Sequence, residues 1–303
     1  MSTNNLAQPP NDKRALPYGS AFAIQDPETL AVLKTPLDLV CLHSTTVVPE
    51  FCAQYHDWIL STQNNRITAL DHFPYRSFSQ GTTEAFDKFY MRNSQRRFRC
   101  FRGEYLYHKL AWRSSYRWCL VEDDVLDPND AVVISLPFSD LGNAHPDMIK
   151  LLQTCDTINV PVLIDCAFFG ICSDIDFDFS WPCITDIVFS LSKSFPVAHA
   201  RVGMRYSRED HDDALLVYAK LDYVNRMSAA LGSRFLDHFG PDFIPNKYRD
   251  QQQVLCQNLG VEPSRTVLFG LGGREWQDYN RGLETNRLSF HKAFLNHLTT
   301  SAQ

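Results

Sequence analysis

The sequence predicts an α/β fold in which helices cover both faces of a mostly parallel sheet. Its 303 residues are 44% hydrophobic, which is enough to bury a core of ordinary size. Short apolar runs alternate with helical patterns, and several runs would be apolar on both faces of a strand. In such sheets, ligands bind at the carboxyl ends of the strands. The expected strands are 75–80, 97–102, 117–121, 131–136, 161–165, 186–191 and 202–206.

The amino-terminal part of the chain is expected to contain an arm and two helices. Residues 1–17 are polar and proline-containing, which predicts a draped or disordered arm. From Val47 to Leu60, apolar side chains recur three and four residues apart, as on one face of a helix. A second helix is expected from Thr82 to Arg92, because threonine and a following acid favour a helix start. A third helical pattern, 148–155, separates two of the strands.

The last third of the chain predicts a smaller unit. One long helix is expected over 212–239, because its apolar pattern is continuous and proline is absent until Pro241. We expect a large domain at 46–235 and a small, abbreviated α+β lobe from 1–45 and 236–303. The other predicted elements are a helix at 248–259, strands at 266–269 and 288–290, and a helix at 291–298.

Charge and cysteine usage argue against several classes of protein. The formal net charge is −6 and the pI is about 5.9, which disfavours binding to nucleic acid or to an anionic membrane. The nine cysteines show no C-x-x-C spacing, which predicts reduced thiols in a cytoplasmic protein. The ten histidines show no metal-binding spacing, so we expect no metal. No apolar run is long enough to span a membrane.

Five arginines between positions 92 and 102 alternate with phenylalanines, a composition that would suit nucleic acid. Alternate residues of a strand face opposite sides, so these arginines cannot all line one groove. We therefore predict that they form a solvated face or a subunit interface.

The stretch Ser190 to Ser194 carries the clearest chemical signal. Lys193 lies just past an apolar run that predicts a strand. Burial lowers the pKa of a lysine, and a buried amine is suited to Schiff-base chemistry. Ser190 and Arg201 supply groups that hold an anion. We interpret the anion as the phosphate of pyridoxal phosphate and Lys193 as the anchor of that cofactor.

Three signals precede this lysine, and each has a simpler explanation. Asp165 ends an apolar run, where it would pair with a protonated pyridine nitrogen or merely cap a loop. Gly81 and Thr82 open a helix whose N–H groups would bind phosphate, unless they form a plain N-cap. Tyr105 follows a strand and would stack on a cofactor ring, unless it belongs to the core or surface.

Taken in order, these signals resemble fold type I pyridoxal-phosphate enzymes of the class I/II aminotransferase family. The resemblance covers about residues 75–206 and implies an internal aldimine at Lys193 and a homodimer. Asn286 to Phe290 is similar to a family strand whose arginine binds the substrate carboxylate, which implies this role for Arg287. The cofactor-binding residues implied by the resemblance are Gly81, Thr82, Tyr105, Ser139, Asp165, Ser190, Lys193 and Arg201.

The chain departs from the family where the cofactor's ring oxygen O3′ is usually bound. Ser139 replaces the family's asparagine, unless the role shifts to Asp140, and Phe168 replaces its tyrosine. The chain is also short for the family, so the lobe that builds part of the substrate pocket is expected to be reduced.

The expected function is therefore a pyridoxal-phosphate-dependent aminotransferase acting on an amino acid. Because both O3′ partners differ, β-elimination, decarboxylation and oxidation stay open as alternatives. A binding protein without turnover is another alternative; it would be coloured yet inert, whereas an enzyme would release a keto acid. Ser190-x-x-Lys193 also fits a penicillin-binding motif, but the companion motifs of that class are missing.

Overall fold

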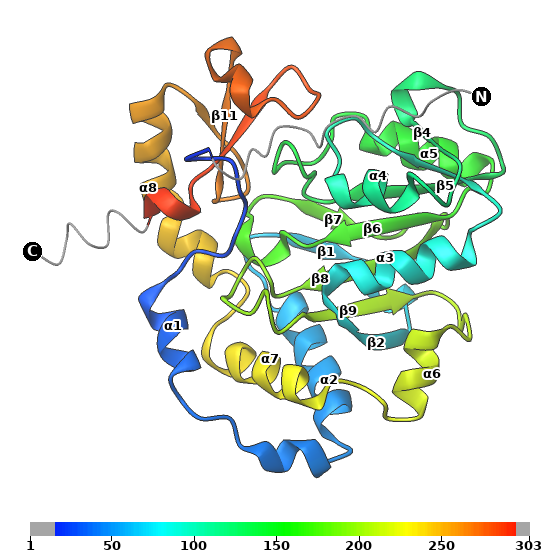
Figure 1. Ribbon diagram of the computed structural model, residues 1–303, viewed down its shortest axis with the longest axis vertical. Helices are drawn as coiled ribbons and strands as arrows, with labels where there is room; N and C mark the ends of the chain where they lie inside the picture. The colour runs from blue at the N-terminus through cyan, green and yellow to red at the C-terminus, as the bar shows by residue number, and fades with distance from the viewer. Residues whose placement is uncertain (1–15, 295–303) are drawn as a thin grey trace, which may run out of the picture.

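A seven-stranded mixed sheet forms the centre of the molecule (Figure 1). The computed structural model describes residues 16–294. All neighbouring strands of this sheet are parallel except at β9, which runs antiparallel to both β2 and β8, so the predicted α/β class is confirmed. In order across the sheet, the strands are β2 (Tyr75–Gln80), β9 (Val202–Ser207), β8 (Ile184–Ser190), β6 (Val162–Cys166), β5 (Asp130–Ser135), β3 (Arg97–Cys100) and β4 (Trp118–Leu120).

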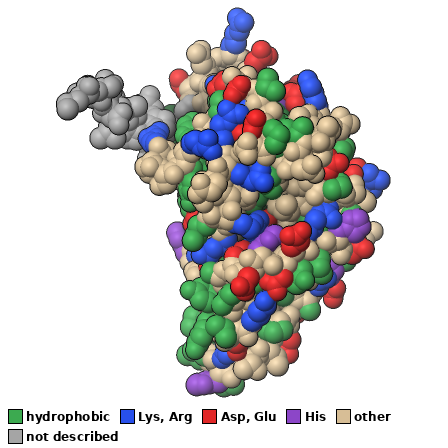
Figure 2. Space-filling view, turned by 90° about the vertical axis from the view of Figure 1, so that its right-hand side faces the viewer, with side chains coloured by type: hydrophobic (Ala, Val, Ile, Leu, Met, Phe, Trp, Pro, Cys, Tyr) green, Lys and Arg blue, Asp and Glu red, His purple; other side chains and the backbone are tan. Residues whose placement is uncertain are grey.

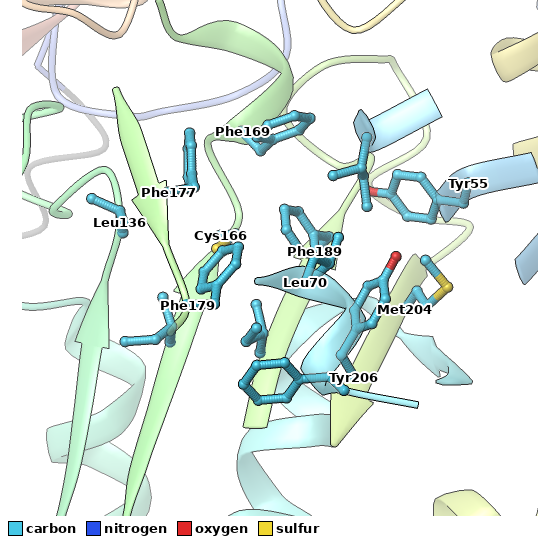
Figure 3. Packing of buried hydrophobic residues seen from close by; sticks show 14 of the residues in the cluster. Tyr55, Leu70, Leu136, Cys166, Phe169, Phe177, Phe179, Phe189, Met204 and Tyr206 are labelled. Carbon is cyan, nitrogen blue, oxygen red and sulfur yellow. The ribbon is translucent and has the colours of Figure 1, made fainter. Parts of the chain in front are cut away.

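Both faces of the sheet are buried, as the apolar runs predict. On β8, Phe189 belongs to the large core cluster on one face, whereas its neighbour Val188 belongs to a second cluster on the other face. Figure 3 shows Phe189, Tyr206 and Met204 beside Tyr55 in the large cluster. The helices that pack around the sheet are α2 (Val47–Leu60), α3 (Gly81–Arg92), α4 (Leu106–Trp112), α5 (Met148–Thr157), α6 (Ala214–Lys220) and α7 (Arg226–His238).

A separate apolar cluster joins the helix Phe243–Leu259 and a small antiparallel sheet. Figure 1 shows this helix beside that sheet at one end of the ribbon. This cluster includes Tyr248, Phe269 and Phe290, and its existence fits a second lobe, although the domain boundaries stay predictions. Its elements are α8 (Phe243–Leu259), β10 (Glu262–Pro263), β11 (Phe269–Gly272) and β12 (Asn286–Ser289). The remaining elements are α1 (Pro27–Leu33), β1 (Arg66–Thr68), β7 (Asp176–Asp178), η2 (Leu39–His43), η3 (Leu70–His72), η4 (Val121–Asp123), η5 (Phe169–Ile171) and η6 (Arg274–Tyr279).

The single long helix predicted over 212–239 is wrong. The chain forms α6 and α7 instead, with a break in which Asp222 adopts a left-handed φ of 59°. The Asn225 side chain accepts a hydrogen bond from the Ser228 backbone N–H at 3.0 Å and so caps a new helix. Apolar spacing continues across the break, which is why periodicity alone does not reveal it.

Element boundaries in the carboxyl-terminal part differ from those predicted. Helix α8 begins earlier than expected, at Phe243, and β11 and β12 are shifted by two or three residues from the predicted strands. The expected last helix, 291–298, is helical over residues 291–294, and its remainder lies outside the described residues. Residues 1–15 of the predicted arm also lie outside them.

The arginine-rich stretch is not simply a solvated face or an interface, because Arg99 is fully buried. Its guanidinium donates to Asp130 Oδ2 at 2.6 Å and to the Leu120 carbonyl at 3.0 Å. Arg97 binds the same carboxylate through Nε at 2.7 Å. The two arginines thus neutralise a buried aspartate at the start of β5, which is a structural use of their charge.

No helix within residues 16–294 is long and apolar enough to cross a membrane. All nine cysteines lie in this range and each is a free thiol. No cluster of three metal-ligating side chains occurs among these residues. Figure 2 shows charged side chains of both signs interspersed over the visible face.

Candidate active site

Lys193 lies in a turn directly after β8, with its side chain largely buried. Its Nζ donates to the Ala21 carbonyl at 2.5 Å and lies 5.7 Å from the centre of the Phe22 ring. Burial and the positive charge of Arg287 lower the pKa of Lys193 to about 8. A substantial fraction of this amine is therefore neutral, and nucleophilic, slightly above neutral pH.

Three strands bring a group of residues suited to binding an anion together near Lys193. Because β9 is antiparallel to its neighbours, Ser190 pairs with Gly203, and Gln80 pairs with Val202. The ends of β2 and β8 therefore meet at the start of β9. The residues gathered there, which we call the anion cradle, are Gly81, Thr82, Thr83, Ser190, Ser192 and Arg201.

Each part of the anion cradle offers a donor. Helix α3 begins at Gly81, so its first backbone N–H groups have no partner within the helix. The Arg201 Nη2 donates to Thr83 Oγ1 at 3.0 Å, and Arg201 adopts a left-handed φ of 55°. The Ser190 hydroxyl donates to Ser192 Oγ at 2.9 Å. A helix start, two hydroxyls and a guanidinium at one point are a setting for a phosphate group.

Gly81 is required by the packing of the anion cradle. Its φ is +69°, which side chains rarely adopt, and a Cβ there would lie 2.4 Å from Arg201 Nη2. Gly203 is constrained by close backbone packing alone, because a Cβ there would lie 3.0 Å from the Gly81 Cα. The two glycines let the arginine lie directly over the start of α3.

Asp165 is the penultimate residue of β6 and is 3% exposed. Its Oδ1 accepts a hydrogen bond from the Ala167 backbone N–H at 3.0 Å. Burial and the negative charge of Glu104 raise the pKa of Asp165 to about 8, although the charge of Lys193 opposes this shift. A cation placed beside Asp165 would restore its ionised form, as a protonated pyridine nitrogen does.

Tyr105 lies within range of the charges of both Asp165 and Arg201. It precedes α4, and its ring stacks on Tyr107 with centroids 6.1 Å apart. Burial and the charge of Asp165 raise the pKa of Tyr105, while Arg201 acts in the opposite direction. The tyrosine keeps 43% of its surface exposed, so its ring has room for a stacking partner.

Arg287 lies on β12 and is 3% exposed. One of its Nη atoms donates to the Ser139 carbonyl, and its guanidinium lies 4.3 Å from the Phe269 ring centre. Burial and the charge of Arg281 lower the pKa of Arg287 to about 9. Its Nε has no hydrogen-bond partner among residues 16–294. A buried guanidinium with an unused donor fits an incoming carboxylate.

The two residues expected from the resemblance near the cofactor's O3′, Ser139 and Phe168, differ in their surroundings. Phe168 packs edge-on against Phe269, with the ring centroids 5.2 Å apart, in the apolar cluster that joins α8 to the small sheet. Ser139 presents its carbonyl to Arg287, and the neighbouring Asp140 is fully buried, with Arg281 Nε 3.7 Å from its Oδ1. Arg281 and Asp140 therefore form an ion pair next to Arg287.

Residues 18–22, which we call the covering segment, were not anticipated as part of the site. The Tyr18 carbonyl accepts from the Ser289 N–H at 2.9 Å, and the Gly19 carbonyl accepts from Arg281 Nη2 at 2.7 Å. Together with the contact between Ala21 and Lys193, these bonds hold the covering segment over the lysine. No motif in the sequence marks these contacts, since all three acceptors are backbone carbonyls.

Two other residues of the site were also missed. Glu104 is buried beside Asp165, and Thr83 is the hydroxyl that contacts Arg201. The sequence could have indicated Thr83 as a site residue, because it lies in the first turn of a helix after a glycine. Glu104 has a weaker signal, a carboxylate between a buried strand and Tyr105.

Comparisons with known proteins identify the fold. No protein-family model matches the chain, and no curated protein sequence is similar to it. An aminotransferase from Staphylococcus aureus is similar in structure, with a TM-score of 0.64 and 13% identity over 99% of this chain and 97% of that chain. A PLP-bound aminotransferase from Clostridium difficile gives a TM-score of 0.64 and 12% identity, with coverages of 93% and 89%.

A third solved structure belongs to a different reaction class. L-threonine-O-3-phosphate decarboxylase from Porphyromonas gingivalis gives a TM-score of 0.61 and 15% identity, covering 93% of this chain and 99% of that chain. At such low identities, the likeness establishes the fold alone.

Proposed function

Because the chain has the aminotransferase fold of fold type I enzymes, we propose that it is an enzyme that uses pyridoxal phosphate to transform an amino acid. The observation that carries this proposal is the convergence of Lys193, the anion cradle and Asp165 at one edge of the sheet. Transamination of an amino acid to a keto acid is the reaction we propose, in a cytoplasmic homodimer.

The residues present fit the cofactor at three separate points. The anion cradle suits its phosphate, because the missing Cβ of Gly81 leaves Arg201 against the start of α3. Buried Asp165, with its raised pKa, suits the cationic ring nitrogen. Lys193, with its lowered pKa, suits the aldehyde. Tyr105 would stack on the ring from the side of α4.

The roles of the protein groups follow from these positions. The bound cofactor supplies an electron-withdrawing ring that stabilises negative charge at the substrate α-carbon. Arg287 binds the substrate carboxylate and thereby orients the α-carbon. Lys193 Nζ then accepts the α-proton, for which a pKa of about 8 is well matched near neutral pH. The covering segment shields this amine from water.

Decarboxylation is the second candidate reaction. It is favoured by the similarity to a decarboxylase and by Phe168, which places no hydroxyl at the usual O3′ position. The two reactions differ in product, since decarboxylation releases carbon dioxide and leaves an amine, whereas transamination leaves a keto acid.

The decisive experiment is the absorption spectrum of the purified chain with added pyridoxal phosphate, before and after borohydride. We expect a yellow protein whose cofactor becomes irreversibly attached on reduction. Incubation of a separate, unreduced sample with a panel of amino acids should produce keto acids. A chain that takes up no cofactor would refute the proposal, and one that binds it but turns over no amino acid would instead be a binding protein.

Replacing Gly81 with alanine is expected to weaken pyridoxal phosphate binding by about tenfold or more, because losing one charge-assisted hydrogen bond from Arg201 to the phosphate costs about 1.5–3 kcal/mol. The new methyl group would displace Arg201. Titration calorimetry measures the effect. Gly240→Ala is the matched control, because a Cβ at Gly240 meets nothing within 4 Å. Equal affinity in both variants would contradict the assignment of the anion cradle.

A further inference from the structure

Glu104 is a buried carboxylate that the proposed reaction does not use. It is 4% exposed and lies in the loop between β3 and α4. Its Oε2 accepts from the Ser135 backbone N–H at 2.8 Å, and its Oε1 accepts from the Ser135 hydroxyl at 2.5 Å and from the Tyr105 N–H at 2.7 Å. These three bonds fix the orientation of the carboxyl group.

The sheet brings this group next to Asp165. Ser135 ends β5 and is the register partner of Asp165 on the adjacent parallel strand β6. Paired residues of neighbouring strands point to the same face and lie about 5 Å apart. By binding Ser135, Glu104 is therefore held near the aspartate, within range for its charge to act on Asp165, at the strand ends where the ring nitrogen would lie.

We propose that Glu104 and Asp165 form a carboxylic acid pair that retains one proton until a cation arrives, with Glu104 acting as a positioning residue through Asp165. The inference rests on the proposed function for its role in catalysis. Two buried carboxylates this close cannot both ionise easily, so the first charge opposes the second. A protonated pyridine ring beside Asp165 would be stabilised by both groups.

The surrounding charges support this assignment. The negative charge of Glu104 raises the pKa of Asp165, second only to burial, and burial also raises the pKa of Glu104 itself. The cations that act on the pair are Lys193 and Lys109. Among residues 16–294, neither of these lysines donates a hydrogen bond to Asp165 or Glu104. The titratable and charged groups that act on or sense the pair are Lys193, Lys109, Tyr90, Tyr105, Cys100 and Cys166.

The pair differs from a purely structural use of Glu104. If Glu104 only ties Ser135 to the loop and stays ionised throughout, it acts on Asp165 as a fixed charge, and Asp165 titrates with one inflection. If the pair shares a proton, the two groups titrate together, and Asp165 shows two inflections. The two uses therefore predict different titrations of Asp165.

The test is carboxyl ¹³C NMR of the full chain without cofactor, with the Asp165 signal assigned through Asp165→Asn. In the wild type, we expect Asp165 to show two inflections with pH, one from each member of the pair. In Glu104→Gln, we expect one inflection and a proton affinity lowered by at least about tenfold. Ser135→Ala is the matched control, because it removes one of the same hydrogen bonds but keeps the charge of Glu104.

A single Asp165 inflection in the wild type would overturn the pair even if Glu104→Gln fails to fold. An Asp165 titration that is unchanged in Glu104→Gln, or changed equally in Ser135→Ala, would also overturn it.

In the cofactor-loaded protein, ¹⁵N NMR of the pyridine nitrogen should show deprotonation at a lower pH in Glu104→Gln. Failure to bind cofactor would refute the proposed function while leaving the titration of the pair interpretable.

Discussion

Replacing Lys193 with alanine is expected to abolish covalent retention of pyridoxal phosphate after borohydride treatment and to lower turnover by about 10⁴-fold or more. The amine is both the proposed anchor and the proposed general base, and proton transfer by such a group contributes up to about 10⁴-fold alone. Mass spectrometry of the reduced protein measures the first effect, and release of keto acid measures the second.

The matched control for this variant is Lys150→Ala, which removes an exposed lysine of α5. In the wild type, the rate of cofactor attachment should rise with pH up to about pH 8, because the pKa of Lys193 is lowered to about 8 and the neutral amine reacts. Attachment that persists in Lys193→Ala would show that another amine is the anchor.

Replacing Asp165 with asparagine is expected to lower turnover by about 10²–10³-fold, the usual effect of removing a buried electrostatic partner of the reacting group. Asparagine nearly keeps the shape of the side chain but carries no charge to hold the ring nitrogen protonated. Steady-state kinetics at saturating cofactor measure the loss. A variant with unchanged turnover would remove Asp165 from the mechanism.

The same substitution should stabilise the cofactor-free chain. The folded pKa of Asp165 is about 8 and the ordinary value is 3.8, so the folded state binds the extra proton between these values. Its contribution to stability is therefore present below about pH 4 and is lost as pH rises towards 8. At pH 8, chemical denaturation should show Asp165→Asn to be more stable by on the order of a few kcal/mol. Equal stability at pH 8 would contradict the raised pKa.

Much of the fold follows from local sequence patterns, and the exceptions have physical reasons. Strands such as β5 and β6 are buried on both faces, so their apolar runs are distinct from the surrounding segments. The break between α6 and α7 depends on a left-handed Asp222 and a side-chain cap at Asn225, which do not interrupt the apolar period. Burial of Arg99 depends on Asp130, a partner 31 positions away in sequence.

The candidate site likewise contains residues that could be predicted from the sequence and residues that could not. Lys193 comes shortly after β8 and Asp165 is the penultimate residue of β6, each at the close of an apolar run, so their place at the strand ends could be predicted from the order of the chain. The covering segment could not, because it contacts Lys193 through a backbone carbonyl and thus carries no residue-type signal. The role of Glu104 depends on which strands are neighbours, since Ser135 joins it to Asp165 only through the pairing of β5 with β6.

The antiparallel course of β9 also bears on how the chain folds. Gln80 and Val202 are register partners although 122 positions separate them (202 − 80 = 122). Pairing of such distant segments carries a high loop-closure entropy and tends to form late. The anion cradle therefore exists only once this edge of the sheet has closed. A phosphate bound there would stabilise the folded state by mass action. It would also slow the separation of β2 from β9.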